Sequence, residues 1–123
     1  FPLHFRRHEF RPGSGGEGQH RGGLGVDLEL VVETANPARG NTAGDGIRHG
    51  ACGLQGGHDG QPHDYRLLSD GREPRRLKTK EVGIEIRPGD VLEIHSGGGG
   101  GWGPPEKRSA DAHRHDREEG LVT

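Results

Sequence analysis

The stretch LKTKEVGIEIRPGDVLEIHSGGGGGWGPP, residues 77–105, decides the fold that we predict. Apolar residues alternate with Gly83 and Glu85 between Val82 and Ile86, which is the period of a half-buried strand. The next four residues, 87–90, read Arg-Pro-Gly-Asp and place proline and glycine as a type II turn requires. Residues 91–95 then form a second strand. The pattern predicts a β-hairpin that runs directly into a glycine run.

The glycine run, Gly97 to Gly101, removes almost every side chain from the chain after the second strand. A backbone without side chains can approach another segment, a ligand or a partner very closely. We favour a tight crossing of chain segments, and Gly98, Gly99 and Gly100 are also candidates for a ligand or interface surface. Trp102 is expected to anchor the far end of the run by burying a large apolar area.

Strand patterns outside this stretch predict the rest of the sheet. Residues 1–12 alternate apolar and basic side chains and suit an edge strand, whereas residues 25–34 carry the clearest alternation in the chain. Residues 63–68 form a further short strand, and residues 35–46 consist of turn-forming residues that predict a mobile loop. We therefore predict a mainly β fold, an antiparallel sheet of about five strands with long glycine-rich loops.

A short helix is predicted at the end of the chain. Ser109 can cap it, residues 110–119 contain no helix breaker, and Gly120 suits its end. The chain thus divides into a β-rich part, residues 1–103, and a helical tail, residues 104–123.

Composition limits what the chain does alone. Among 123 residues, 25 are glycine and only 26% are hydrophobic, so the core is small and the ordering entropy is high. The net charge of −2 gives no reason to expect nucleic acid or an anionic membrane, and no apolar run reaches transmembrane length. The single cysteine excludes an internal disulfide and favours a cytoplasmic protein. We therefore expect the chain to form one domain that is only marginally stable by itself.

Charged side chains offer two candidate anion sites. Arg48 lies between two glycine-rich stretches, and Lys80 precedes the strand at residues 82–86. Either could hold a phosphate or a carboxylate, Arg48 in a bidentate manner. The alternative, which we favour, is an ion pair that locks the glycine loops together.

Histidine, carboxylate and thiol groups suggest weaker sites. His58, Asp59, His63 and Asp64 have the right chemistry for zinc or manganese, but they lie in a glycine- and proline-rich turn that fixes no geometry. Cys52 lies three residues from His49, whereas a lone cysteine is usually a small packed apolar residue. We predict no metal site in this segment and assign no catalytic residue.

Several glycine motifs together resemble one known family. They occur in this order: Arg11-Pro12-Gly13-Ser14-Gly15-Gly16-Glu17-Gly18, Arg21-Gly22-Gly23, Gly44-Asp45-Gly46, Gly53-Leu54-Gln55-Gly56-Gly57, the Pro88-Gly89-Asp90 turn, Gly97 to Gly103, and Glu119-Gly120-Leu121-Val122. This order resembles the C-terminal part of the hydantoinase B/oxoprolinase family over residues 2–123. Members of that family are several times longer. The family usually has apolar residues on the inner face of the final helix, where this sequence has His113 and Arg117, so weaker or wetter docking is expected.

The resemblance implies a role in ATP-dependent hydrolysis of a cyclic amide, such as a hydantoin or 5-oxoproline. A hydantoinase A-type subunit or domain would use ATP, and the upstream part of the chain's own subunit would hold the catalytic and metal-binding residues. This segment would then bind no cofactor, and it would be inactive alone. Two alternatives are a non-catalytic assembly segment of a related ketone carboxylase and a glycine-rich binding module. The second lacks the basic stripe and interleaved aromatic residues of nucleic-acid binders.

Overall fold

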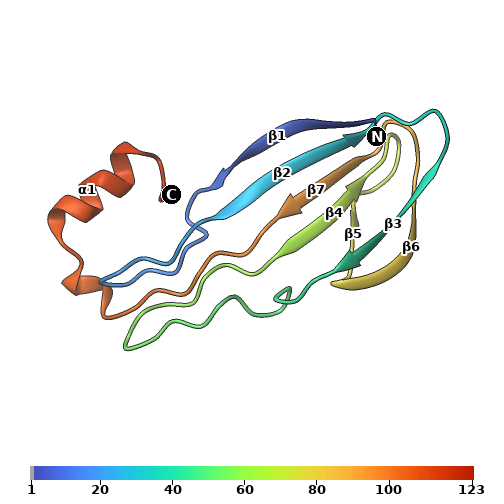
Figure 1. Ribbon diagram of the computed structural model, residues 1–123. Coiled ribbons are helices and arrows are strands. Elements are labelled where there is room, and N and C mark those ends of the chain that lie inside the picture. The colour runs from blue at the N-terminus through green and yellow to red at the C-terminus, as the bar shows by residue number, and fades with distance from the viewer. Residues whose placement is uncertain (1) are drawn as a thin grey trace.

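The computed structural model describes residues 2–123, which form two antiparallel sheets, a glycine-rich extension and a C-terminal helix (Figure 1). The strands are β1 (Leu3–Arg11), β2 (Gly25–Val32), β3 (Ala38–Ala43), β4 (Asp64–Leu68), β5 (Arg75–Arg76), β6 (Lys80–Ile86) and β7 (Val91–His95). A 3-10 turn, η1 (Pro105–Lys107), precedes the helix α1 (Ala110–Glu118). The predicted mainly β class with a short C-terminal helix is confirmed.

The larger sheet has five strands in the order β1-β2-β7-β4-β5, and every pair of neighbouring strands in it is antiparallel. The predicted strands at residues 1–12, 25–34 and 63–68 correspond to β1, β2 and β4. β1 is an edge strand, as its sequence predicted. The two-residue strand β5, at the opposite edge, was not foreseen, because a strand this short has no periodicity to read.

The predicted hairpin of residues 82–86 and 91–95 is wrong, because β6 pairs with β3 and β7 pairs with β2 and β4. The turn between them has the expected geometry: the Asp90 amide donates to the Arg87 carbonyl at 3.0 Å, and Gly89 has a φ of 85°. The turn is bonded to β2 instead, since Val32 donates to Asp90 at 3.0 Å and accepts from Gly89 at 2.8 Å. These bonds place the two strands in different layers.

The expected loop at residues 35–46 contains the strand β3, which is the partner of β6. Side-chain oxygens stabilise this pair: Asn41 Oδ1 accepts from the Gly83 amide at 2.9 Å, and Thr42 Oγ1 accepts from the Glu81 amide at 3.0 Å. Only Ala38 of this strand packs on the core. A strand with one apolar contact shows no alternation, which is why its sequence resembles a loop.

The hydrophobic core lies between the two sheets. Its buried members are Val32, Leu67, Leu77, Ile84 and Ile86, with Ala38, Tyr65 and Leu92 packed against them. Val82 is not part of this face, although it continues the alternation of Ile84 and Ile86, and it is 82% exposed. An irregularity in the β3–β6 register between Gly40 and Thr42 reverses the side-chain alternation at this point.

Residues 13–25, 49–62 and 96–103, which we call the glycine bundle, extend from one end of the larger sheet (Figure 1). Backbone groups of different segments bond one another there. The Gly98 amide donates to the Gln61 carbonyl at 3.1 Å and the Gly101 amide to the His58 carbonyl at 2.9 Å. On another side, Gly99 donates to the Gly23 carbonyl at 2.9 Å. The run 96–103 therefore lies between the other segments and bonds to each.

Contacts in the bundle repeat every three residues. A Cβ on Gly98 would lie 2.0 Å from the Ser14 carbonyl oxygen, and one on Gly101 would lie 2.1 Å from that of Glu17. Gly100, one residue before Gly101, faces a different segment: a Cβ added there would lie 2.0 Å from the Cys52 carbonyl oxygen. Three residues per turn without internal hydrogen bonds is the geometry of polyproline II chains, and such chains need glycine where their axes approach closely.

Residues 97–101 must be glycine because there is little or no room for a Cβ atom, and not because of their backbone conformation. None of the residues 97–101 has a positive φ, so an L-amino acid could adopt each conformation. The expectation of a close approach is thus met by contacts within the chain itself. The clash is least at Gly99, whose added Cβ would lie 3.1 Å from the Gly23 amide nitrogen.

The helix α1 has the ends that the sequence predicted. Ser109 Oγ accepts from the Ala112 amide at 3.2 Å, and Gly120 terminates the helix with a φ of 66°. His113 and Arg117, the expected inner-face residues, are exposed. The buried residue of the helix is Asp116, at 3% exposure.

Asp116 fastens the helix to the glycine bundle. Arg108 donates to its Oδ2 from Nε at 3.0 Å and from Nη2 at 2.7 Å, and Arg21 Nη2 lies 3.2 Å from Oδ1. Burial raises the pKa of Asp116, but the hydrogen bonds from Arg21 and Arg108 outweigh it and hold this pKa below its usual value. The helix thus docks through a buried ion pair in place of apolar contacts.

Alanine substitutions along the bundle should separate crowded glycines from uncrowded ones. Gly98→Ala and Gly100→Ala should destabilise on the overpacking scale of about 1–3 kcal/mol or more, and Gly99→Ala should cost less. Gly23→Ala is the matched control, since nothing lies within 4 Å of the added Cβ. Melting temperatures measured on the longest folded form of the protein check this order. Equal melting temperatures for all four variants would contradict the close packing.

Removing the Asp116 carboxylate should release the helix. Asp116→Ala leaves Arg21 and Arg108 without their buried counter-ion, and breaking such a pair costs about 3–5 kcal/mol. Trypsin should then cleave at Arg114 or Arg117 faster than in the unaltered protein. Asp111→Ala is the control, because its exposed carboxylate pairs only with Arg114. Identical cleavage rates for the two variants would show that the ion pair does not hold the helix.

Candidate functional site

Two adjoining hollows lie where the smaller sheet meets the glycine bundle. The first has a volume of about 730 Å³ and the second about 340 Å³, and they share the wall formed by Asp45, Gly46 and His49. The first is also lined by Ile47, Arg48, Arg76, Leu77, Lys78 and Thr79. The second is also lined by Gly50, Ala51, Gln61, His63, Gly97 and Gly98.

Cationic side chains surround the first hollow. Arg48 and Lys78 form no salt bridge with any residue between 2 and 123, whereas Arg76 Nε lies 2.9 Å from Asp64 Oδ1. At the rim, Lys80 Nζ lies 3.5 Å from Asp45 Oδ1, and both side chains are exposed. The excess of positive charge suits a carboxylate or phosphate group.

The second hollow presents a histidine edge and glycine backbone. His63 Nδ1 accepts a hydrogen bond from the Gly97 amide at 3.0 Å, and the ring stacks on Tyr65 with centroids 5.8 Å apart. Because Nδ1 accepts, the ring proton resides on Nε2, which can donate to a ligand. Gly46 lies beside this edge, where an added Cβ would be 3.0 Å from His63 Cδ2.

The structure brings together only some of the residues that the sequence singled out. Arg48 lines the first hollow and Gly98 lines the second. Lys80 lies at the rim, where it pairs with the wall residue Asp45. Gly99 and Gly100 line neither hollow and pack inside the bundle. Trp102 lies apart from both hollows.

Trp102 is 48% exposed, so the expectation that it buries a large apolar area is wrong. The amides of Trp102 and His20 each donate to the carbonyl of the other residue at 2.9 Å. The centroids of the two rings are 5.6 Å apart. Leu54, which flanks the same bridge, is 62% exposed. The surrounding segments are chains of glycine that supply no side chains to cover an indole.

The remaining polar candidates have separate structural contacts. Asp59 Oδ1 accepts from the Gly53 amide at 2.8 Å, and His58 lies 3.4 Å from Glu17 on the surface. Cys52 is exposed and is not a packed core residue. Within residues 2–123, no group of three or more histidine, cysteine or acidic side chains could hold a metal ion.

The sequence analysis did not identify Arg76 and Lys78, which line the first hollow. The basic run at residues 72–80 was the signal that could have indicated them.

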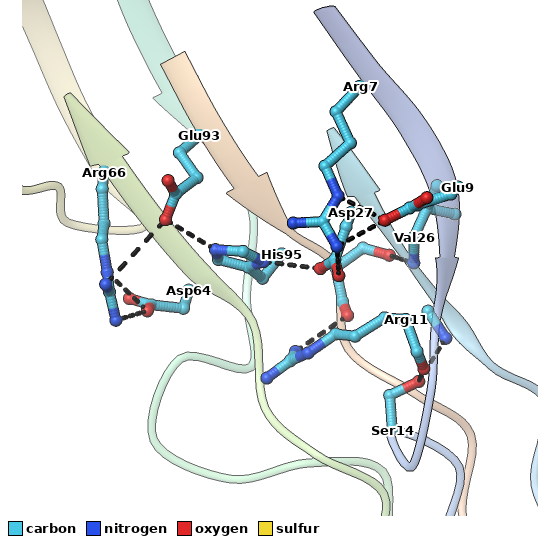
Figure 2. Close-up of polar contacts among 12 residues, drawn as sticks. Arg7, Glu9, Arg11, Ser14, Val26, Asp27, Asp64, Arg66, Glu93 and His95 are labelled. Carbon is cyan, nitrogen blue, oxygen red and sulfur yellow. Dashed lines mark hydrogen bonds and ion pairs between the residues drawn. The ribbon is translucent and has the colours of Figure 1, made fainter. Parts of the chain in front are cut away.

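A charged network covers the face of the larger sheet opposite the core (Figure 2). At its centre, His95 of β7 joins two carboxylates: Nδ1 lies 2.5 Å from Asp27 Oδ1 and Nε2 lies 2.7 Å from Glu93 Oε1. Arg7 lies 3.4 Å from Asp27, and Arg66 lies 3.9 Å from Glu93. Each carboxylate in this network already has a cationic partner, so the network links strands and leaves no free acid or base.

His95 should make stability depend on pH. Burial opposes its protonation, but the bonds to Asp27 and Glu93 outweigh this and raise the pKa of His95 above its usual value. The stabilisation is therefore complete below the unfolded-state pKa of about 6.5 and is lost as pH rises through the raised folded-state pKa. Urea unfolding between pH 5.5 and 8.5 should show this loss. His95→Gln should remove that part of the slope, and an unchanged slope would contradict the assignment.

The sequence of this β domain matches a known protein family. The model of the family described as hydantoinase B/oxoprolinase matches residues 1–105. The chain belongs to the hydantoinase B/oxoprolinase family, as its glycine motifs indicated.

Proteins similar to this chain include a 5-oxoprolinase and a caprolactamase of known structure. The 5-oxoprolinase PfmaA of Pestalotiopsis fici is 34% identical over 119 residues, which are 93% of this chain and 9% of that protein. The crystal structure of an ATP-dependent caprolactamase from Pseudomonas jessenii matches 100% of this chain and 22% of its own, with a TM-score of 0.78 and 27% identity. An acetone carboxylase structure shares the fold at a TM-score of 0.73 and 21% identity, over 98% of this chain and 20% of its own.

These proteins are much longer than the chain described here, which spans between 9% and 22% of them. No helix within residues 2–123 has both the length and the apolar character needed to cross a membrane.

Proposed function

We propose that residues 1–123 are the C-terminal part of a subunit that takes part in ATP-dependent hydrolysis of a cyclic amide of the hydantoin or 5-oxoproline type. The observation that carries this proposal is the match of the whole chain to an ATP-dependent caprolactamase, at a TM-score of 0.78 and 27% identity. A lactam is a cyclic amide, and a relative named as a 5-oxoprolinase matches 93% of the chain.

Coupling to ATP suits the chemistry of such a ring. A cyclic amide is stabilised by resonance, and phosphorylation of its oxygen by ATP would remove that resonance. Water would then add to the ring carbon, the C–N bond would break to give an open-chain acyl phosphate, and a second water would release phosphate and the free carboxylate. Residues 2–123 offer no group of side chains that fits a divalent metal, and the sequence contains no phosphate-binding motif ending in Gly-Lys-Ser/Thr. ATP and metal would therefore be bound by a hydantoinase A-type partner and by the upstream part of the same subunit.

Within this assembly, the first hollow, which cationic side chains surround, is the part of the chain suited to bind an anion. Arg48 has no counter-ion within residues 2–123, and Lys80 shares Asp45 with the wall of the hollow. A substrate carboxylate, or the phosphate of an activated intermediate, would fit this charge. Gly98, Gly99 and Gly100 would keep the wall in place by packing, and Trp102 would contact a partner subunit through its exposed indole.

A second candidate is an assembly segment of a ketone carboxylase, which is supported by the fold likeness to acetone carboxylase. That likeness, at 21% identity, concerns the fold alone. The two candidates differ in their need for bicarbonate, because hydrolysis consumes water and ATP but no carbon source.

The proposal predicts ring opening only by the complete assembly. The full-length subunit with its A-type partner should hydrolyse 5-oxoproline or a hydantoin in the presence of ATP, and residues 1–123 alone should not. Arg48→Ala should raise KM several-fold through the loss of a charge-assisted contact. Arg39→Ala, at an exposed arginine without a salt bridge among the described residues, should leave KM unchanged. Turnover that requires bicarbonate and a ketone would favour the second candidate.

A further inference from the structure

One face of the strands β1 and β2 carries an apolar strip that nothing in the described structure covers. Leu3, Phe5 and Phe10 of β1 are 42%, 60% and 66% exposed. Beside them on β2, Val26, Leu28 and Leu30 are only half-buried. Three large exposed apolar side chains on one strand form the kind of continuous patch that marks an interface.

The register of β1 keeps these side chains on one face. Phe5 is opposite Leu30 and Phe10 is opposite Val26. Phe10 is five positions after Phe5, so strict alternation would place the two rings on opposite faces. An irregularity between Phe5 and Arg7 restores the parity. Without it, Phe10 would point to the charged face that contains His95.

The second layer of the domain covers only the other half of this sheet face. Its apolar residues Ile84 and Ile86 pack on Val32 of β2 and on Leu67 of β4. In Figure 1, β3 and β6 lie on the side of the sheet away from β1. An apolar sheet face is stable only when a further layer covers it, so the layer must continue over β1 and β2.

The chemistry of the strip requires an apolar occupant. Among its residues only His8, whose ring stacks on Phe5 with centroids 5.8 Å apart, can carry a charge. Of the three arginines of β1, Arg6 and Arg7 pair with acidic groups, and Arg11 donates to the Pro62 and Ser96 carbonyls. Nucleic acid and acidic peptides would find no arginine or lysine among the residues of the strip.

Chain length identifies the source of that occupant. The caprolactamase chain contains the same fold as 22% of its length, so the matched residues there are covalently joined to a much larger remainder. A covalently joined segment has a far higher effective concentration than a second copy or a separate subunit.

We infer that an apolar segment from the remainder of the same subunit packs on Leu3, Phe5 and Phe10 and completes the second layer of the domain. The inference rests on the proposed function, in which residues 1–123 are part of a longer subunit. It adds a defined surface through which this part is held against the rest.

Thiol accessibility in the full-length subunit tests the inference. Phe5→Cys and Phe10→Cys are made separately in a Cys52→Ser background, and Val82→Cys is the matched control at an apolar residue that is 82% exposed on the smaller sheet. Peptide mass spectrometry after maleimide labelling gives the rate at each position alone. The thiols at positions 5 and 10 should react at least tenfold more slowly than the thiol at position 82 in the folded subunit, and equally fast in urea.

Each other outcome has a distinct meaning. Equal rates at positions 10 and 82 in the folded subunit would overturn the inference, because the strip would then be open to solvent. Protection that disappears on dilution would assign the strip to a second copy, and protection that needs the A-type partner would assign it to that partner; either would also overturn it. Failure of ring opening in a subunit that still protects both thiols would refute the proposed function alone.

Discussion

The approach of backbone to backbone in the glycine bundle is the constraint on which the rest of this structure depends. The run 97–101 lies among segments whose carbonyl oxygens would be about 2 Å from an added Cβ at Gly98, Gly100 and Gly101. At that distance no side chain fits, so the segments are held by hydrogen bonds between backbones. The strands of the larger sheet continue into this bundle, and its position fixes where the hollows, the helix and the exposed tryptophan lie.

Polar interactions supply much of the order that a small apolar core cannot. The core contains five buried aliphatic side chains, whereas the opposite sheet face is joined by the network around His95 and the helix is docked by Asp116. Ion pairs with little exposure cost desolvation but require defined geometry. A domain of this composition therefore gains a specific structure from its charges, and its apolar strip on β1 and β2 stays available for another layer.

The candidate site follows from the same arrangement. The joined hollows lie at the boundary between the glycine bundle and the smaller sheet, where Gly98 lines the wall and Arg48 supplies charge without a counter-ion among the described residues. No group of three or more histidine, cysteine or acidic side chains that could hold a metal ion accompanies them within residues 2–123. In the proposed function, the segment would contribute a wall, an anion contact and surfaces for assembly to a longer subunit.

Sequence alone determined the elements that depend on local signals. The edge strand β1, the clear alternation of β2, the turn at residues 87–90, the capped helix and the order of glycine motifs all act over a few residues, and these predictions agree with the structure. The crowding at Gly98 and Gly100 was also foreseen as a close approach, although the neighbouring segments were not identified.

Only the tertiary structure decided which elements meet. The turn after β6 bonds to Val32 and sends β7 into the other sheet, so two strands adjacent in sequence do not pair. β3 forms because Asn41 and Thr42 find partners on a distant strand, and Asp116 is buried because two arginines converge on it. Such pairings join residues far apart in the chain, where periodicity carries no information. The physical reason is that register and burial are set by partners that local sequence does not contain.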